Sequence, residues 1–159
     1  MIYIACDHGG YKMKKLICEE LARLQIQYDD IGSHSGEIVR YPYYAARVAS
    51  AVSSGKIKRG ILICSTGIGM SIIANKYKGV RASLCTNEYM GKMTRAHNDS
   101  NILCLGGKIT GDNITLDILR AWLTTEYEGG RHDISLDMIK SAEEEMLGEK
   151  CWIPTDPII

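Results

Sequence analysis

The segment Gly60-Ile61-Leu62-Ile63-Cys64-Ser65-Thr66-Gly67-Ile68-Gly69-Met70-Ser71 decides the fold class. Its first part, residues 60–64, is apolar throughout, which is typical of a strand covered on both faces of a parallel sheet. The glycine-rich turn 65–69 follows, and it opens a helix that we expect to reach Asn75. A buried strand, a glycine turn and a helix in direct succession predict one unit of a parallel α/β fold.

The same alternation continues on both sides of this segment. Strand-like patterns lie at residues 1–5, 27–31, 60–64, 80–85 and 101–105. Helix-like patterns follow Gly10 and lie at residues 42–52, 69–75, 88–97, 111–122 and 135–147. We therefore predict a Rossmann-like three-layer α/β sandwich with a five-stranded parallel sheet and helices on both faces.

Length and charge limit the classes of function. The 159 residues suit one domain, which we expect over 1–147, followed by a C-terminal tail at 148–159. Lys+Arg and Asp+Glu both number 19, so no net charge favours nucleic acid or an anionic membrane as partner. The apolar start at residues 1–5 lacks the basic flank of a signal peptide, and no apolar run is long enough to span a bilayer. A cytoplasmic protein is expected.

The six cysteines do not suggest a metal or disulfide framework. They lie at positions 6, 18, 64, 85, 104 and 151, and no two of them have CxxC spacing. A zinc site or a redox dithiol therefore has little support, and no metal site is predicted. Most of these thiols are expected to be small buried apolar groups.

Polar side chains follow several of the predicted strands. Asp7 and His8 follow the first strand, residues 64–69 follow the third, and Lys108 follows the fifth. In parallel α/β sheets ligands bind outside the carboxyl ends of the strands. We therefore expect these groups to line a ligand site.

Cys64 is the strongest chemical candidate. Backbone N–H groups of the glycine turn and a helix N-terminus favour negative charge beside it. A thiolate there could take a proton from carbon while the N–H groups stabilise the resulting enediolate. The alternative is a buried cysteine before an ordinary glycine turn. The turn matches neither the P-loop pattern nor G-x-G-x-x-G, so a nucleotide site is not indicated.

Three further residues have both a structural and a functional interpretation. Asp7 could cap the following helix or move protons between sugar oxygens. His97 could interact with a helix C-terminus or act as a general acid. Arg131 falls in a break between helices, where it is either solvated or binds phosphate.

Together these segments resemble the ribose-5-phosphate isomerase B family, which includes galactose-6-phosphate isomerase subunits. The matching motifs are Cys6-Asp7-His8-Gly9, Tyr41-Pro42, Cys64 with Thr66-Gly67-Ile68-Gly69-Met70-Ser71, Ala74-Asn75-Lys76, Gly79-Val80-Arg81-Ala82, His97-Asn98-Asp99 with Asn101, and Tyr127-Glu128-Gly129-Gly130-Arg131-His132. They run in order through residues 1–147. The resemblance implies an aldose–ketose isomerase that interconverts ribose 5-phosphate and ribulose 5-phosphate through an enediolate.

The resemblance also implies roles for individual residues. Cys64 would be the base, assisted by Thr66, while His97 would help to open the sugar ring and Asp7 would handle hydroxyl protons. The groups implied to contact the substrate are Asp7, His8, Tyr41, Ser65, Thr66, Gly67, Ile68, Gly69, Asn98, Lys108 and Arg131. No cofactor is implied. Members of the family are dimers or tetramers whose active sites are shared between subunits.

Three positions depart from the family pattern. Lys108 and Ser135 stand where the family has arginines, and Arg40 stands where it often has aspartate. Lys108 keeps the charge without the bidentate fork, and Ser135 loses the charge. Two alternatives therefore stay open: an isomerase of another sugar phosphate, such as allose or galactose 6-phosphate, and a non-catalytic sugar-phosphate binding protein.

Overall fold

The computed structural model describes residues 1–146, in which strands and helices alternate. The strands are β1 (Ile2–Cys6), β2 (Tyr28–Asp30), β3 (Arg59–Cys64), β4 (Ala82–Leu84) and β5 (Ile102–Gly106). The helices are the 3-10 turn η1 (His8–Gly10), α1 (Tyr11–Arg23), α2 (Tyr41–Ser53), α3 (Ile68–Ala74), α4 (Glu88–Asn98), α5 (Asp112–Thr124) and α6 (Arg131–Met146).

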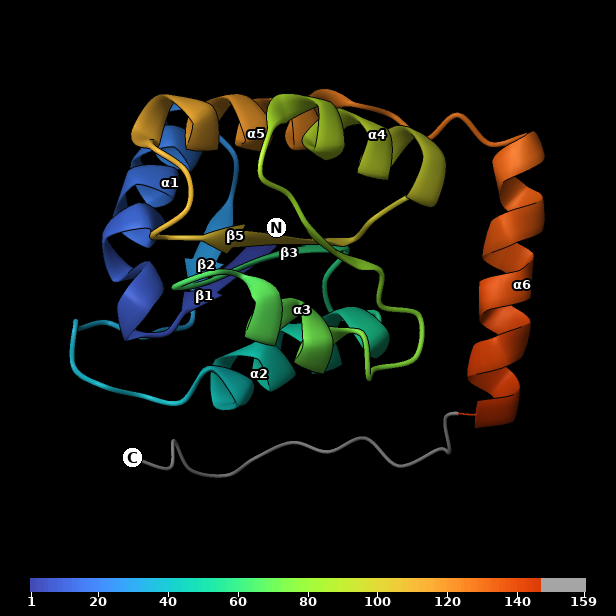
Figure 1. The fold of residues 1–159 in the computed structure, drawn as a ribbon, viewed down its shortest axis with the longest axis horizontal. Helices are drawn as coiled ribbons and strands as arrows, with labels where there is room; N and C mark the ends of the chain where they lie inside the picture. Colours follow the sequence, from blue (N-terminus) through green and yellow to red (C-terminus); the bar gives the residue numbers. More distant parts are fainter. Residues whose placement is uncertain (147–159) are drawn as a thin grey trace.

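The strands form one parallel sheet in the order β2-β1-β3-β5-β4. Helices α2 and α3 cover one face of it, while α1, α4 and α5 cover the other (Figure 1). Parallel neighbours need crossover helices, and these helices account for both outer layers. The predicted three-layer α/β fold is confirmed.

The central strands are buried on both faces, and alternate residues point to opposite layers. In β3, Leu62 and Cys64 belong to the apolar cluster under α2 and α3. Ile61 and Ile63 belong to the cluster under α1 and α5. This double burial explains why residues 60–64 of the strand are all apolar, and it fixes the face on which the Cys64 thiol lies.

The strand order reverses between β1 and β3. Helix α1 leaves β1 on one face of the sheet, and α3 leaves β3 on the other (Figure 1). Such a switch point opens a crevice at the carboxyl ends of the two strands. The Asp7 N–H donates to the Ile63 carbonyl at 3.1 Å, so the loops that follow the two strands start side by side.

Strand β4 is shorter than the predicted 80–85. The Arg81 N–H donates to Asn101 Oδ1 at 2.8 Å, and Asn101 Nδ2 donates to the Gly79 carbonyl at 2.7 Å. The Asn101 amide thus takes the place of strand pairing before Ala82. The prediction was wrong about this end because a side chain 20 residues away supplies the partner.

Helix α6 begins at Arg131, not at Ser135 as predicted. Gly129 and Gly130 are both left-handed, with φ of 65° and 62°, and the His132 N–H donates back to the Gly129 carbonyl at 3.2 Å. The glycine pair therefore turns the chain directly into the helix. As a result Arg131 lies in the first turn of a helix, and its predicted place in a break between helices was wrong.

Helix α6 packs little against the rest of the described chain. It has no buried residue, and Ile134 and Met138 are 67% and 69% exposed. It stands beside the amino ends of the strands, away from the α2/α3 and α1/α4/α5 layers (Figure 1). Apolar side chains on such a helix are available for contact with another surface.

Within residues 1–146, none of the helices has the length and apolarity that a membrane span requires. The predicted tail at 148–159 lies outside the described residues, and the domain boundary at 147 stays a prediction.

Candidate active site

The Cys64 thiol lies where β3 ends and the glycine turn begins. The Gly67 N–H donates to its Sγ at 3.0 Å, and the side chain is 5% exposed. A donor aimed at sulfur stabilises charge on it. Cys6 and Cys85 instead donate to the Ser33 and Ser83 carbonyls, at 3.7 and 3.8 Å. Burial raises the pKa of Cys6 and Cys85 to about 12 and that of Cys18 to about 11.

The turn itself depends on Gly67. Its φ is 78°, and a Cβ at this position would come 2.9 Å from the Leu105 carbonyl carbon. No other residue fits this position without moving β5. The N–H groups that the sequence assigned to an enediolate are partly engaged already, because Gly67 donates to Cys64 and Ile68 donates to Thr66 Oγ1 at 3.3 Å.

Asp7 combines a structural and a chemical position. It accepts the Gly9 N–H at 2.8 Å and so caps η1, as one interpretation of the sequence held. Its side chain is nevertheless 6% exposed, and this burial raises the pKa of the carboxyl above its ordinary value. The Gly9 hydrogen bond and the charges of His8 and Lys108 oppose that rise.

The remaining candidates from the first half of the chain lie close to this turn. The Tyr41 ring lies against Gly69, where an added Cβ would be 2.7 Å from ring carbons. The Lys108 N–H donates to the Ser65 carbonyl at 3.0 Å, and exposed His8 contacts the Val39 carbonyl through Nδ1 at 3.3 Å. The structure therefore brings Asp7, His8, Tyr41, Cys64, Ser65, Thr66, Gly67, Ile68, Gly69 and Lys108 together at the carboxyl edge of the sheet.

His97, Asn98 and Arg131 lie at the other end of the sheet. Helix α4 carries the chain back to the start of β5, so its last turn is at the amino edge. There the Asn98 carbonyl accepts Arg81 Nε at 2.9 Å, just before β4 begins. Six-residue β3 separates the two edges by about 20 Å at the usual rise per residue. One chain therefore carries two groups of candidate residues that do not meet.

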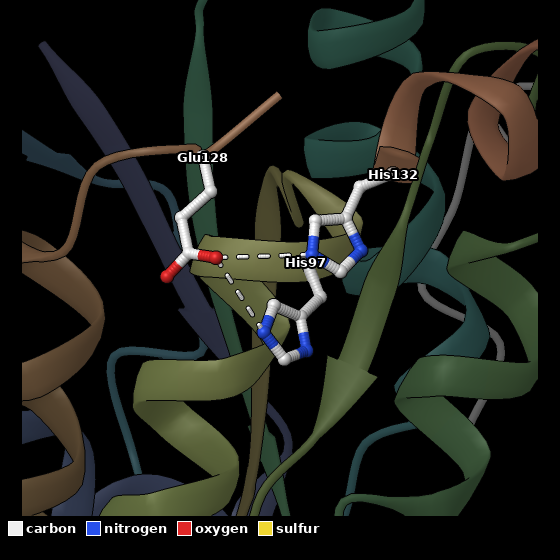
Figure 2. Close-up of side chains that lie close together, drawn as sticks. All are labelled: His97, Glu128 and His132. Carbon is white, nitrogen blue, oxygen red and sulfur yellow. Dashed lines mark ion pairs between the residues drawn. The ribbon is translucent and has the colours of Figure 1, made fainter. Parts of the chain in front are cut away.

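The amino-edge group includes two residues to which the sequence analysis gave no role. The His97 and His132 rings stack with centroids 4.2 Å apart and 14° between their planes. Glu128 Oε2 faces both rings, 3.8 Å from His97 Nε2 and 3.7 Å from His132 Nε2 (Figure 2). A Glu and a His four residues apart are a weak signal, and His97 joins them only in three dimensions.

A groove of about 460 Å³ lies beside this cluster, between α6 and the segment around β4. Its polar lining includes Asn75, Arg81, Asn98 and Glu143, and the Glu143 carboxylate accepts the Gly79 N–H at 2.9 Å. The groove adjoins Asn98, not Cys64, so it belongs to the amino-edge half.

A parallel α/β sheet with reactive side chains at its switch point defines a small-molecule enzyme fold, and comparisons with known proteins identify the family. The family model described as Ribose/Galactose Isomerase matches residues 2–139. Ribose-5-phosphate isomerase B of Escherichia coli (strain K12) is 41% identical over 143 residues, covering 90% of this chain and 96% of its own.

Solved structures agree. Ribose-5-phosphate isomerase B of Clostridium thermocellum superposes with a TM-score of 0.88 at 46% identity, covering 91% of this chain and 97% of that one. The Mycoplasma genitalium enzyme with bound ribulose-5-phosphate gives a TM-score of 0.88 at 38% identity, with the same coverage. This chain belongs to the ribose/galactose isomerase family, and the resemblance seen in its sequence is confirmed.

Proposed function

We propose that the protein interconverts ribose 5-phosphate and ribulose 5-phosphate, with Cys64 as the base. The observation that carries this proposal is the Cys64 thiol, held by the Gly67 N–H at the switch point and next to the loop that carries Asp7. The relatives named for this reaction, one of them with ribulose-5-phosphate bound, support the choice of substrate.

The reaction needs two proton movements. The Cys64 thiolate takes the proton from C2 of the open-chain aldose, and the electron pair moves to O1 to give the enediolate. The thiol then returns the proton to C1, and the O2 hydroxyl proton passes to O1, which leaves a carbonyl at C2. The backbone of residues 65–69 stabilises the enediolate oxygens.

Asp7 and Thr66 serve these movements. Burial raises the pKa of the Asp7 carboxyl toward neutral pH. A group with such a pKa both accepts and donates a proton readily, which suits proton transfer between O2 and O1. Thr66 lies two residues after Cys64 in the glycine turn. Its hydroxyl assists the thiol in the proton transfer. Tyr41 and His8 then bind sugar hydroxyls from the side of α2 and η1.

The proposal includes an active site shared between two copies of the chain. His97, Asn98 and Arg131 lie at the opposite edge of the sheet from Cys64, so a second copy must bring them to it. The exposed apolar side chains of α6 support contact between copies in a homodimer or homotetramer. In the completed site His97 assists ring opening and Arg131 binds the phosphate.

Another sugar phosphate, such as allose or galactose 6-phosphate, is the second candidate. Ser135 is exposed on α6 one turn after Arg131, so no second guanidinium stands there. Lys108 offers a single ammonium on the carboxyl edge. A weaker phosphate clamp favours a substrate that is also held by further hydroxyl groups.

The test is formation of ribulose 5-phosphate by wild-type protein and by Cys64→Ala, with a chelator present. Cys18→Ala is the matched control, because Cys18 lies on α1 away from the crevice. We expect turnover in wild type and in the control, and almost none in Cys64→Ala. Equal turnover in all three would remove Cys64 as base, and higher turnover on a hexose phosphate would favour the second candidate.

The proposal also places the protein in the cytoplasm. A catalytic thiol must stay reduced, and the five described cysteines are all free. The partner is then a small sugar phosphate, and nucleic acids and membranes have no part in the reaction.

A further inference from the structure

We propose that His97, Glu128 and His132 form a binding site for Zn²⁺ that inhibits the enzyme. One ligand atom from each side chain lies within 4.8 Å of the other two. Two imidazoles and one carboxylate are the ligand set of many zinc sites that keep a position open. The binding itself follows from this geometry, whereas the inhibition rests on the proposed role of His97.

The cluster is held in place by the backbone. The Glu128 N–H donates to the Ala96 carbonyl at 3.0 Å, which ties its segment to the last turn of α4. The left-handed pair Gly129 and Gly130 then directs the chain into α6. The backbone thus keeps the three side chains within reach of one another before any ion arrives. The stacked imidazoles must still turn out of parallel, because each nitrogen binds an ion in the plane of its own ring.

The present separations leave room for an ion. Distances of 3.7 and 3.8 Å from Glu128 Oε2 to the two Nε2 atoms are too long for hydrogen bonds. Tetrahedral zinc with bonds near 2.0–2.2 Å needs ligand atoms about 3.4 Å apart. Binding therefore draws the groups together by less than about 1.5 Å. Glu128 Oε2 is already close to that separation from both nitrogens, so the larger adjustment falls on the two imidazoles (Figure 2).

The ligand types select the ion. Imidazole nitrogen suits zinc and similar transition metals, whereas Mg²⁺ and Ca²⁺ prefer sets of oxygen ligands. The imidazoles are largely covered, with side-chain exposures of 34% for His97 and 16% for His132. Partial burial strengthens the attraction between the Glu128 carboxylate and a divalent cation.

Zinc would inhibit the enzyme because it occupies the lone pair of His97 Nε2. A coordinated His97 Nε2 can neither accept nor donate a proton. On the proposed function, the zinc-bound enzyme then loses assistance to ring opening. Because the site uses a residue of α4 and two from the α6 region, the ion would also restrain the approach of these elements to a second copy.

The first test measures Zn²⁺ binding without substrate. Metal-stripped wild-type protein competes with a chromophoric chelator for Zn²⁺, alongside Glu128→Gln and His132→Gln. Glu126→Gln and His34→Gln are matched controls, because both residues are exposed and outside the cluster. We expect each cluster variant to lose at least about tenfold in affinity, since even outer partners of metal ligands cost that much. The controls should match the wild type.

Two results would overturn the site. One is wild-type affinity in both cluster variants. The other is zinc binding that disappears in Cys64→Ser while it persists in Glu128→Gln, since the ion would then be held by the thiol. Circular dichroism and melting temperature confirm that each variant is folded.

The second test concerns inhibition. Zn²⁺ should lower the turnover of wild type, a chelator should restore it, and Glu128→Gln should need at least about tenfold more Zn²⁺ for the same fractional loss. If the wild type binds zinc through this cluster but turns over no sugar phosphate, the proposed function is refuted and the zinc site is not. Equal sensitivity of wild type and Glu128→Gln would refute the inhibitory role.

Discussion

The Gly67 N–H donates to the Cys64 Sγ across a turn in which Gly67 is left-handed, at φ 78°. This contact joins the fold to the chemistry, because the same peptide that turns β3 into α3 also directs a donor at the thiol. Any side chain at Gly67 must move either that peptide or the end of β5.

Gly67→Ala is therefore expected to abolish most turnover and to destabilise the fold. Gly79→Ala is the matched control, because Gly79 has φ 75° but no atom within 4 Å of an added Cβ. The left-handed conformation alone costs about 1–2 kcal/mol, so Gly79→Ala should lose about that and keep its turnover. Urea unfolding and isomerase assays measure both effects. Equal losses of stability and activity in the two variants would contradict the role given to Gly67.

Cysteine alkylation should distinguish Cys64 from the other thiols. At pH 8 the thiols of Cys6 and Cys85 stay neutral, because burial raises their pKa to about 12. Peptide mapping after brief treatment with iodoacetamide should find Cys64 modified first among the described cysteines, and sugar phosphate should slow that reaction. Faster labelling of Cys6 or Cys85 than of Cys64 would count against the thiolate.

Asp7 should make stability depend on pH. Its pKa is raised from 3.8 by burial, so its folded form binds a proton more readily than its unfolded form. The stability that this proton supplies is fully present below pH 3.8 and is lost as pH rises through the folded pKa. Asp7→Asn stays neutral, so its stability relative to wild type should increase across that rise. Urea unfolding of both proteins from acid to neutral pH measures the difference, and a constant difference would refute the raised pKa.

Two inactive variants should restore each other if the active site is shared. In a dimer whose two copies carry the same substitution, Cys64→Ala or His97→Ala inactivates both active sites. A mixed dimer has one site with both substitutions and one with neither, so random mixing in a two-fold dimer should recover about a quarter of wild-type turnover. The two chains are unfolded and refolded together, with separately refolded chains as control. No recovery in the mixture would mean that the Cys64 and the His97 of each active site come from the same copy of the chain.

Most of the fold could be predicted from the sequence because the parallel sheet is buried on both faces. The apolar run 60–64 and the glycine turn after it leave little choice of structure, and the strands on either side repeat that pattern. The end of β4 could not be predicted, since it depends on the side chain of Asn101. The start of α6 was missed because two left-handed glycines form a tight entry into the helix as well as a break.

The sequence predicts the carboxyl-edge half of the candidate site but not the amino-edge half. Residues that follow strands, such as Asp7, Cys64 and Lys108, lie together as expected. His97 ends a helix that precedes a strand, and in a parallel fold such a position lies at the amino edge of the sheet. Its contact with Glu128 and His132 needs a turn whose direction the residue types do not reveal, so that cluster emerges only from the folded chain.

Helix α4 returns the chain across the sheet, and this return has a consequence for how the enzyme behaves in dilute solution. If the proton-transfer half and the ring-opening half meet only between copies, isolated chains hold no complete site. Specific activity then falls as protein concentration drops below the dissociation constant of the assembly, and at that limit the rate grows with the square of the protein concentration.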